Sequence, residues 1–181
     1  EERASKAREA FGTDAANVYT DYMELLKNDE IDVIHVCTPN ISHAEISIAA
    51  MESGKHVMCE KPIAVSVKAA RQVNEAYKKY PHLKFGIMFQ ARTNPMYQKI
   101  RQLVTSGELG EITRVTWIVT NWFRSWSYYA SGGWRATWLG EGGGTLINQC
   151  PHNLDMIQWA LGGLKPNRVT AVGFVGKTHP I

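Results

Sequence analysis

Two ionisable side chains occupy positions in the sequence where chemistry could be done. Lys61 directly follows a short apolar run, and His152 follows a glycine-rich stretch. An imidazole with an ordinary pKa of about 6.5 can accept and release a proton near neutral pH. An ammonium group can donate a hydrogen bond to a reacting oxygen and favour its negative charge. The pair predicts a site that moves a proton to or from an oxygen atom.

Lys61 stands at the end of a predicted β-α-β unit. Two apolar runs, residues 31–37 and 56–59, are typical of strands buried in a parallel sheet. Between them, Ser42 and Glu45 have the spacing of a capping box, which predicts a helix that begins directly after Ser42. Ligands of open parallel sheets bind beyond the carboxyl ends of the strands. We therefore expect a ligand to contact the residues that follow the two runs: Thr38, Pro39, Asn40, Glu60 and Lys61.

The pattern of the chain changes near residue 110. Before this point, the sequence predicts helices over residues 3–11 and 21–28, a helix between Ser66 and Pro81, a strand over 83–89 and a helix from Asn94 to Thr105. From Ile112 to Phe123, apolar and polar residues alternate, which is typical of an antiparallel strand with one wet face. Residues 169–175 resemble a further strand.

We therefore predict two parts. Residues 1–110 form an α/β, Rossmann-like parallel sheet that is incomplete, and residues 111–181 begin an α+β domain with an antiparallel sheet. No glycine-rich G-x-G-x-x-G turn after a first strand is found in the sequence, although dinucleotide-binding folds normally start with one. We expect the sequence to be an internal piece of a longer protein. The isolated piece should then bind NAD poorly.

Composition excludes several other classes of protein. A net charge of +3 without a cluster of basic residues argues against nucleic acid as a partner. No apolar run approaches the ~20 residues that span a membrane. The cysteines, three in number and far apart, fit neither a zinc site nor a disulfide framework. We therefore expect a reducing compartment, the cytoplasm, and no metal.

Three motifs give the chain a resemblance to the Gfo/Idh/MocA oxidoreductases. They are Thr38-Pro39-Asn40 with His43, Glu60-Lys61-Pro62, and the stretch GGGTLINQCPHNLD that begins at Gly142. The resemblance runs through essentially the whole chain. It implies NAD or NADP as cofactor, hydride transfer at a sugar, inositol or related polyol, and a homo-oligomeric full-length protein.

The resemblance also implies roles for individual residues. His152 would be the base and Lys61 the donor to the reacting oxygen, and Asn148 stands where the family has an aspartate. Asparagine cannot carry a proton between states, so His152 and Lys61 would have to perform the proton transfer. The expected cofactor-binding residues are Thr38, Pro39, Asn40, His43, Glu60, Lys61, Gln90, Trp134 and Arg135, and the expected substrate-binding residues are Lys61, Arg124, Tyr128, Asn148 and His152.

Several alternatives remain open. The aromatic residues between 122 and 138 are either anchors on a sheet or a platform for a sugar ring. His43 either lines the cofactor or is solvated, Glu60 either binds ribose or holds Lys61, and Asp155 more naturally pairs with a structural partner than reacts. The whole protein could instead be a redox-neutral, NAD-dependent glycoside-cleaving enzyme, or a non-catalytic sugar sensor on the same scaffold.

Overall fold

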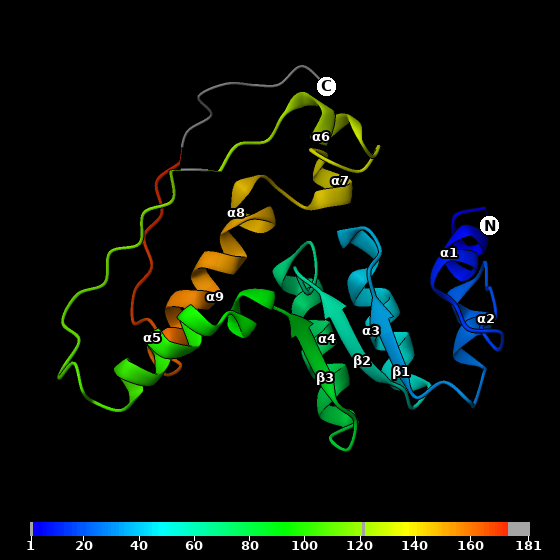
Figure 1. Ribbon diagram of the computed structural model, residues 1–181, viewed down its shortest axis with the longest axis horizontal. Helices are drawn as coiled ribbons and strands as arrows, with labels where there is room; N and C mark the ends of the chain where they lie inside the picture. Colours follow the sequence, from blue (N-terminus) through cyan, green and yellow to red (C-terminus); the bar gives the residue numbers. More distant parts are fainter. Residues whose placement is uncertain (1, 121, 174–181) are drawn as a thin grey trace.

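The centre of the molecule is a three-stranded parallel sheet. The computed structural model describes residues 2–120 and 122–173. In the sheet, β1 (Val33–Val36) pairs with β2 (His56–Glu60), and β2 pairs with β3 (Phe85–Met88), both in parallel (Figure 1). These strands confirm the predicted α/β, Rossmann-like fold class.

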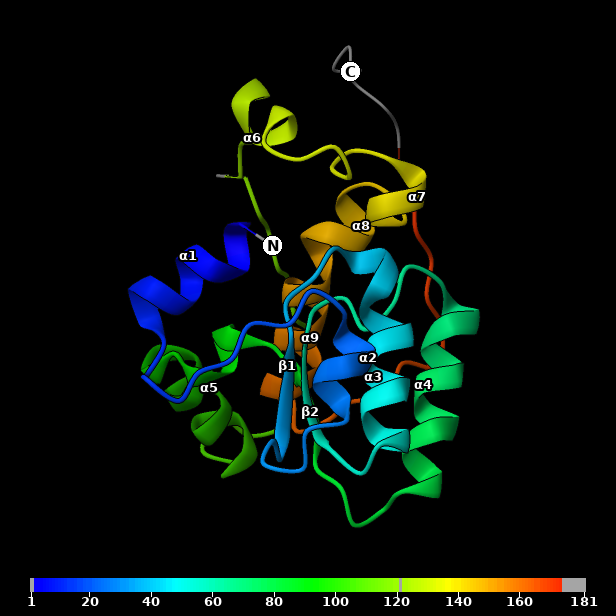
Figure 2. The same cartoon turned by 90° about the vertical axis from the view of Figure 1, so that its right-hand side faces the viewer.

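Helices cover one side of this sheet and bury its apolar side chains. Figure 2 shows α2 (Tyr22–Leu26), α3 (His43–Glu52) and α4 (Val67–Lys79) together on one side of the strands. The core between the layers is formed by apolar residues of strands and helices, among them Val36, Met51, Val57, Cys59 and Val73. Burial of such side chains is the main favourable term in folding. α1 (Glu2–Phe11) contributes no buried residue to this core.

Capping residues fix where two of the predicted helices begin. Ser66 accepts a hydrogen bond from the Ala69 amide at 3.2 Å and starts α4, which ends before Pro81 as predicted. Asn94 accepts a hydrogen bond from the Met96 amide at 2.9 Å and starts α5 (Pro95–Thr105).

The capping box predicted for α3 is not formed, although the helix begins at His43 as expected. A 3-10 turn, η1 (Asn40–Ser42), precedes the helix and gives Ser42 a helical backbone conformation. The Ser42 hydroxyl consequently turns back and donates to the carbonyl of Pro39 at 2.9 Å. Glu45 instead accepts a hydrogen bond from the Tyr22 hydroxyl at 2.7 Å.

The second half of the chain is mainly short helices. α6 (Trp126–Ala130), α7 (Trp138–Glu141) and α8 (Thr145–Asn148) lead into α9 (Cys150–Ala160). Pro151 lies in the first turn of α9, where a missing amide proton costs nothing, so this helix begins one residue before the proline and is not kinked by it. α9 packs against α5 and the 3-10 turn η2 (Gln90–Thr93), as Figure 1 also shows.

The antiparallel sheet expected after residue 110 is not formed by the described residues. Residues 112–120 and 169–173 have no strand hydrogen bonds, and residues 174 and 175 of the second predicted strand lie outside the described part. Alternation specifies which face of a strand would be buried, but a ladder also needs a partner for its amides and carbonyls. Among the described helices, none combines the length and the apolar character that crossing a membrane requires.

Candidate active site

Lys61 follows β2 and reaches across to the second half of the chain. Its Nζ donates a hydrogen bond to the backbone carbonyl of Asn148 at 2.8 Å. Burial lowers the pKa of the Lys61 ammonium, and the positive charges of Arg124 and Arg135 lower it further, while Glu60 and Glu141 oppose the shift. A lysine with a lowered pKa gives up a proton more readily than one in water.

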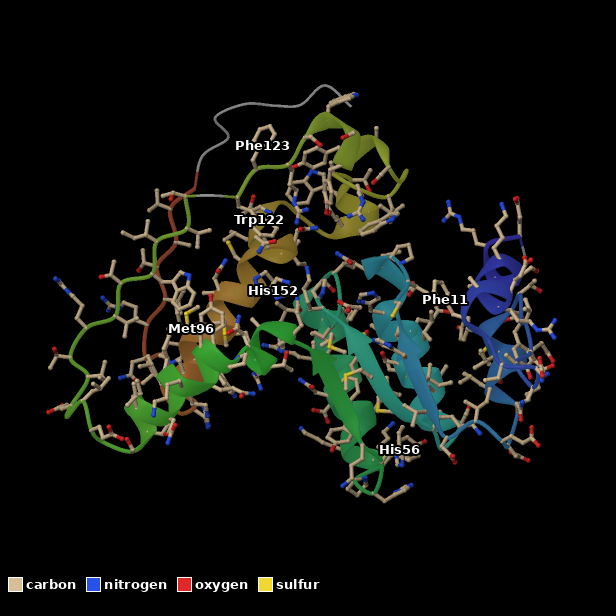
Figure 3. The ribbon with its side chains drawn as sticks, in the orientation of Figure 1. Phe11, His56, Met96, Trp122, Phe123 and His152 are labelled. Atoms are coloured by element: carbon tan, nitrogen blue, oxygen red, sulfur yellow. The ribbon has the colours of Figure 1, made fainter. Side chains whose placement is uncertain are left out.

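His152, in the first turn of α9, lies in the electrostatic field of Lys61. Burial lowers the pKa of its imidazole, and the positive charge of Lys61 lowers it further. Its Nδ1 is buried without a hydrogen-bond partner among the described residues. The ring meets Phe89 edge to face, with the centroids 6.2 Å apart, beside the carboxyl ends of the strands (Figure 3). An imidazole whose pKa is lowered by burial and by a nearby positive charge is uncharged near neutral pH and can accept a proton.

The side chain of Asn148 is held at both ends of its amide. Its Oδ1 accepts a hydrogen bond from Arg124 Nη2 at 2.7 Å, and its Nδ2 donates to the Glu141 carboxylate. Because one group donates to it and the other accepts from it, the orientation of the amide is determined.

Glu141 is a site residue that sequence reasoning missed. It is 4% exposed, and its Oε2 accepts a hydrogen bond from the Ala136 amide at 2.8 Å. Its backbone carbonyl accepts from Asn40 Nδ2 at 3.1 Å, which joins the loop after β1 to α7. The only signal in the sequence is an acidic residue inserted in a run of glycines. That signal does not reveal burial.

Arg124, Tyr128, Trp134 and Arg135 form one stacked group. The guanidinium carbons of Arg124 and Arg135 lie 4.0 and 4.3 Å from the centroid of the Tyr128 ring. Arg135 also donates to the Tyr128 hydroxyl at 2.6 Å and lies 4.6 Å from the Trp134 ring centroid. Cation–π contacts of this kind hold the long arginine side chains in place.

A cavity of about 820 Å³ opens beside Asn148. Arg124, Asn148 and Gln149 form polar parts of its wall, and Trp117, Trp122 and Trp138 are among its aromatic residues. Neither Lys61 nor His152 lines it, so Asn148 stands between this cavity and the Lys61–His152 pair. The backbone carbonyl of Asn148 accepts the Lys61 hydrogen bond, and its side chain faces Arg124 at the cavity wall, so this residue connects the two.

Two of the expected cofactor-binding residues are occupied by structural contacts at the strand ends. His43 is 1% exposed, and its ring nitrogens lie 2.7 Å from the carbonyl of Pro62 and 2.8 Å from that of Thr38. It is therefore not solvated; it fastens the two loops to each other. Asn40 is buried and bonded to Glu141, as described above.

The other expected cofactor-binding residues are more open. Pro39 caps η1, and Glu60 is the partly buried last residue of β2. Gln90 is exposed on η2, and its backbone carbonyl accepts from the Thr93 hydroxyl at 2.8 Å. The structure thus brings together Lys61, Asn148 and Arg124 through hydrogen bonds, with His152 four residues after Asn148. Gln90 follows Phe89, whose ring meets that of His152.

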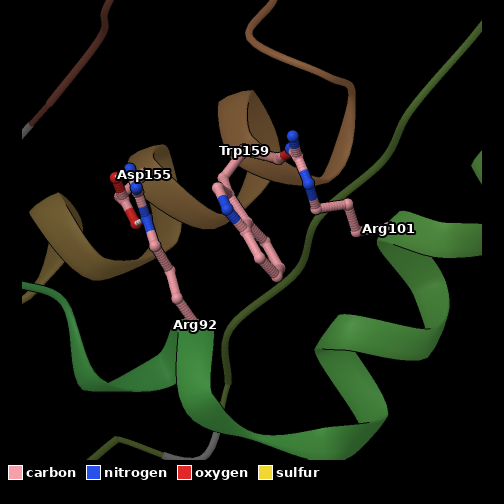
Figure 4. A network of polar contacts seen from close by, with 4 residues as sticks. All are labelled: Arg92, Arg101, Asp155 and Trp159. Carbon is pink, nitrogen blue, oxygen red and sulfur yellow. Dashed lines mark hydrogen bonds and ion pairs between the residues drawn. The ribbon is translucent and has the colours of Figure 1, made fainter. Parts of the chain in front are cut away.

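Asp155 pairs with Arg92, as its predicted structural role requires. Arg92 Nε lies 2.9 Å from Oδ2 and Arg92 Nη2 lies 2.5 Å from Oδ1, a two-point contact between η2 and α9 (Figure 4). One turn further on, Arg101 of α5 donates to the carbonyl of Trp159 and stacks 4.9 Å from its ring centroid. These contacts hold α9, and with it His152, against the first half of the molecule.

Comparison with known proteins agrees with this geometry. Residues 1–86 match the family model described as the Gfo/Idh/MocA oxidoreductase family, NAD-binding Rossmann fold, and residues 97–179 match the C-terminal domain of the same family. The chain belongs to the Gfo/Idh/MocA family.

Similar proteins in this family include sugar and inositol dehydrogenases. The chain is 34% identical over 174 residues to D-glucoside 3-dehydrogenase of Escherichia coli, covering 95% of the chain and 47% of that protein. It is 31% identical over 109 residues to inositol 2-dehydrogenase of Salmonella typhimurium, covering 60% and 32%. A solved structure of levoglucosan dehydrogenase with NADH and L-sorbose superposes with a TM-score of 0.76 at 27% identity, covering 90% and 42%. The chain thus spans less than half the length of these relatives.

The residues of this Gfo/Idh/MocA chain suit a nicotinamide cofactor. The loops after β1 and β2 lie side by side, fastened by His43, at the sheet edge where such folds bind dinucleotides. The unpartnered Nδ1 of His152 and the half-buried Lys61 belong to the same neighbourhood. Within the described residues, no group of histidine, cysteine and acidic side chains could hold a metal ion.

Proposed function

We propose that this chain carries the active site of an oxidoreductase that transfers a hydride between NAD or NADP and a hydroxyl-bearing carbon of a sugar, inositol or related polyol. The observation that supports this most is the hydrogen bond of 2.8 Å from Lys61 Nζ to the carbonyl of Asn148, four residues before His152. It brings Lys61 into the neighbourhood of a histidine 91 positions away in the sequence, and the Lys61 charge lowers the pKa of that histidine. The named relatives, dehydrogenases of glucosides, inositol and levoglucosan, support the substrate class.

In this proposal, Lys61 and His152 divide the work on the hydroxyl group. Among the described residues, Lys61 Nζ donates one hydrogen bond, to Asn148, so its other protons can reach the reacting oxygen and stabilise its negative charge. His152, with its lowered pKa, is uncharged near neutral pH and accepts the hydroxyl proton. The nicotinamide, when bound, accepts or supplies the hydride.

Asn148 and Arg124 act as orienting groups for the substrate. The Asn148 amide is fixed by Arg124 and Glu141 and carries no proton between states. The Nη2 group of Arg124 donates to Asn148 and, at 3.3 Å, to Gln149, which leaves its Nε and Nη1 protons for substrate oxygens. The Tyr128 ring stacks on the Arg124 guanidinium and holds it in place.

We assign the loops after β1 and β2 to the cofactor. Thr38 and Pro39 would form one wall and Glu60 with Lys61 the other, while Gln90, Trp134 and Arg135 would complete the site. The buried Asn40 and His43 would hold these walls in place from behind. His43 contributes by holding the two loops together, since both its ring nitrogens face protein carbonyls.

The test is a reaction of the intact protein with NAD or NADP and a panel of inositols, pyranoses and glycosides. We expect absorbance at the nicotinamide wavelength to rise in proportion to ketone or aldehyde formed. Redox-neutral loss of the aglycone would instead indicate a glycoside-cleaving enzyme. Absence of both reactions, with sugar binding retained, would overturn the proposal in favour of a sensor.

We also propose that the protein works in the cytoplasm, in a reducing environment, as a homo-oligomer. The three cysteines are free, and burial raises the pKa of the Cys59 thiol to about 11, which keeps it protonated and unreactive. Size-exclusion chromatography with light scattering tests the oligomeric state. A monomer at micromolar concentration would contradict it.

A further inference from the structure

The Glu141 carboxylate is buried among groups that all donate hydrogen bonds to it. One oxygen accepts from the Ala136 amide at 2.8 Å and the other accepts from the Asn148 amide. The group is 4% exposed. A buried carboxylate is stable only when its oxygens accept hydrogen bonds. Glu141 therefore requires the donor that Asn148 supplies.

Glu141 also holds backbone in a strained conformation. Ala136, which donates to it, has a φ of 56°, a left-handed conformation that side chains with a Cβ rarely adopt. The residues Trp134 and Arg135 immediately before it belong to the proposed cofactor site. The carbonyl of Glu141 fixes Asn40 of the opposite loop at 3.1 Å. One residue therefore ties three parts of the site together.

The amide of Asn148 suits this position because its two ends differ. The oxygen faces a cation, Arg124, and the nitrogen faces an anion, Glu141. An aspartate here would keep the contact with Arg124 but would place a second carboxylate oxygen against Glu141. The backbone carbonyl of the same residue receives Lys61, so a disturbance of position 148 reaches the proposed donor directly.

We infer that Glu141 is a positioning residue whose buried carboxylate requires a hydrogen-bond donor at position 148, so that only one of these two positions can hold an ionised carboxylate. The coupling itself needs no substrate; its effect on turnover rests on the proposed function. Through Asn148, Glu141 sets the position of Lys61, although it touches neither the reacting oxygen nor Lys61 in a hydrogen bond.

A swap of the two chemistries provides the test. In Asn148→Asp, two carboxylates face each other; in Glu141→Gln, two amide donors compete. In the double variant, the glutamine oxygen can accept from Ala136 and its nitrogen can donate to the new aspartate, whose other oxygen accepts from Arg124. The double variant therefore restores every one of these contacts, with the negative charge moved from position 141 to position 148.

We expect the melting temperatures of the intact protein and its variants to reflect how many of these contacts each one keeps. At pH 8, Asn148→Asp should melt about 6 °C or more below the wild type, since an unpaired buried charge is costly. Glu141→Gln should also melt lower, and the double variant should recover more than half of the Asn148→Asp loss. Glu75→Gln, an exposed residue paired with Lys78, is the matched control and should change the melting temperature by less than about 2 °C.

The pH dependence separates a charge effect from a packing defect. Two facing carboxylates share a proton, so the folded Asn148→Asp protein holds a proton that the unfolded chain releases above about pH 4. Its stability should therefore fall as pH rises from 5 to 8, relative to the wild type. The cations near this pair, Lys61 and Arg135 as well as Arg124, are present in both proteins. A loss that is equal at both pH values, or a double variant no more stable than Asn148→Asp, would overturn the inference.

Turnover gives the second measurement. If the proposed function holds, Asn148→Asp should lower kcat at least tenfold at pH 8, and the double variant should regain most of it. Suppose that the melting temperatures show the coupling while neither the wild type nor any variant turns over a polyol. In that case the coupling of Glu141 to Asn148 is supported and the proposed function fails. If the wild type turns over a polyol but the single variants are unaffected in both measurements, the coupling of Glu141 to Asn148 is refuted and the proposed function is not.

Discussion

Lys61 and Asn148, 87 residues apart, are joined by a hydrogen bond of 2.8 Å from the lysine Nζ to the asparagine backbone carbonyl. This bond crosses from the end of β2 to the end of α8. Lys61 thereby becomes part of the segment that carries His152, four positions further along the chain. The two halves of the proposed site are therefore linked by a side chain of one half that binds the backbone of the other.

The proximity of Lys61 and His152 predicts how the histidine titrates. Burial and the lysine charge both lower the pKa of His152, so its NMR titration midpoint should lie below 6.5. Lys61→Met removes the charge and should move that midpoint upward. Lys78→Met, which removes a charge from the exposed face of α4, should leave it unchanged. An unchanged midpoint in Lys61→Met would show that the two groups are too far apart to interact.

The same shift predicts a dependence of stability on pH. The folded protein binds the His152 proton less readily than the unfolded chain, whose histidines titrate near 6.5. The contribution of His152 to stability is therefore present above about pH 6.5 and declines as pH falls through the lowered pKa. Wild type and His152→Gln should differ in this slope between pH 7 and 5 in urea unfolding. Parallel curves would contradict the shift.

The Arg92–Asp155 pair should stabilise the packing of α9. The contact has two points, and the Asp155 side chain is only 11% exposed although that of Arg92 is 45% exposed. A double-mutant cycle with Arg92→Leu and Asp155→Asn should give a coupling of about 1 kcal/mol. The exposed pair Lys6–Glu2, in a helix with no buried residue, should give a few tenths of a kcal/mol. Equal couplings for both pairs would contradict a holding role for Asp155.

Gly142 should tolerate no side chain. It ends α7 with a φ of +84°, and an added Cβ would lie 2.6 Å from the Cβ of Val65 and 2.8 Å from its Cα. Gly142→Ala should therefore lower the free energy of unfolding by about 2–4 kcal/mol, from backbone strain and overlap together. Gly54→Ala, at φ +76° with open space around it, should cost only about 1 kcal/mol. Similar losses at both positions would show that α7 does not pack on the loop after Lys61.

Much of the first half of the chain was predictable because its signals are local. Apolar runs and capping residues such as Ser66 and Asn94 act within a few residues, and they placed the three strands and the helices between them. The capping box at Ser42 failed because the turn before α3 is itself helical, which the spacing of two residues cannot reveal.

The candidate site was predictable only in part, because some of its contacts leave no local signal in the sequence. Lys61 and His152 were proposed from residue type, position and family motifs, but Glu141 contacts Asn40, Ala136 and Asn148 in ways that depend on tertiary packing. Burial of a single acidic residue leaves no periodic pattern in a sequence. The strand predicted after Ile112 needed a partner, and alternation alone does not supply one.

The most direct measurement of the proposed active site is the steady-state turnover of Lys61→Met with NAD and the best polyol substrate, set beside its affinity for the cofactor. We predict that kcat falls at least about 100-fold, since a donor to the reacting oxygen is lost, while the Kd for NADH changes less than about tenfold. Lys78→Met should behave as the wild type. A Lys61→Met protein with kcat within threefold of the wild type would contradict the account.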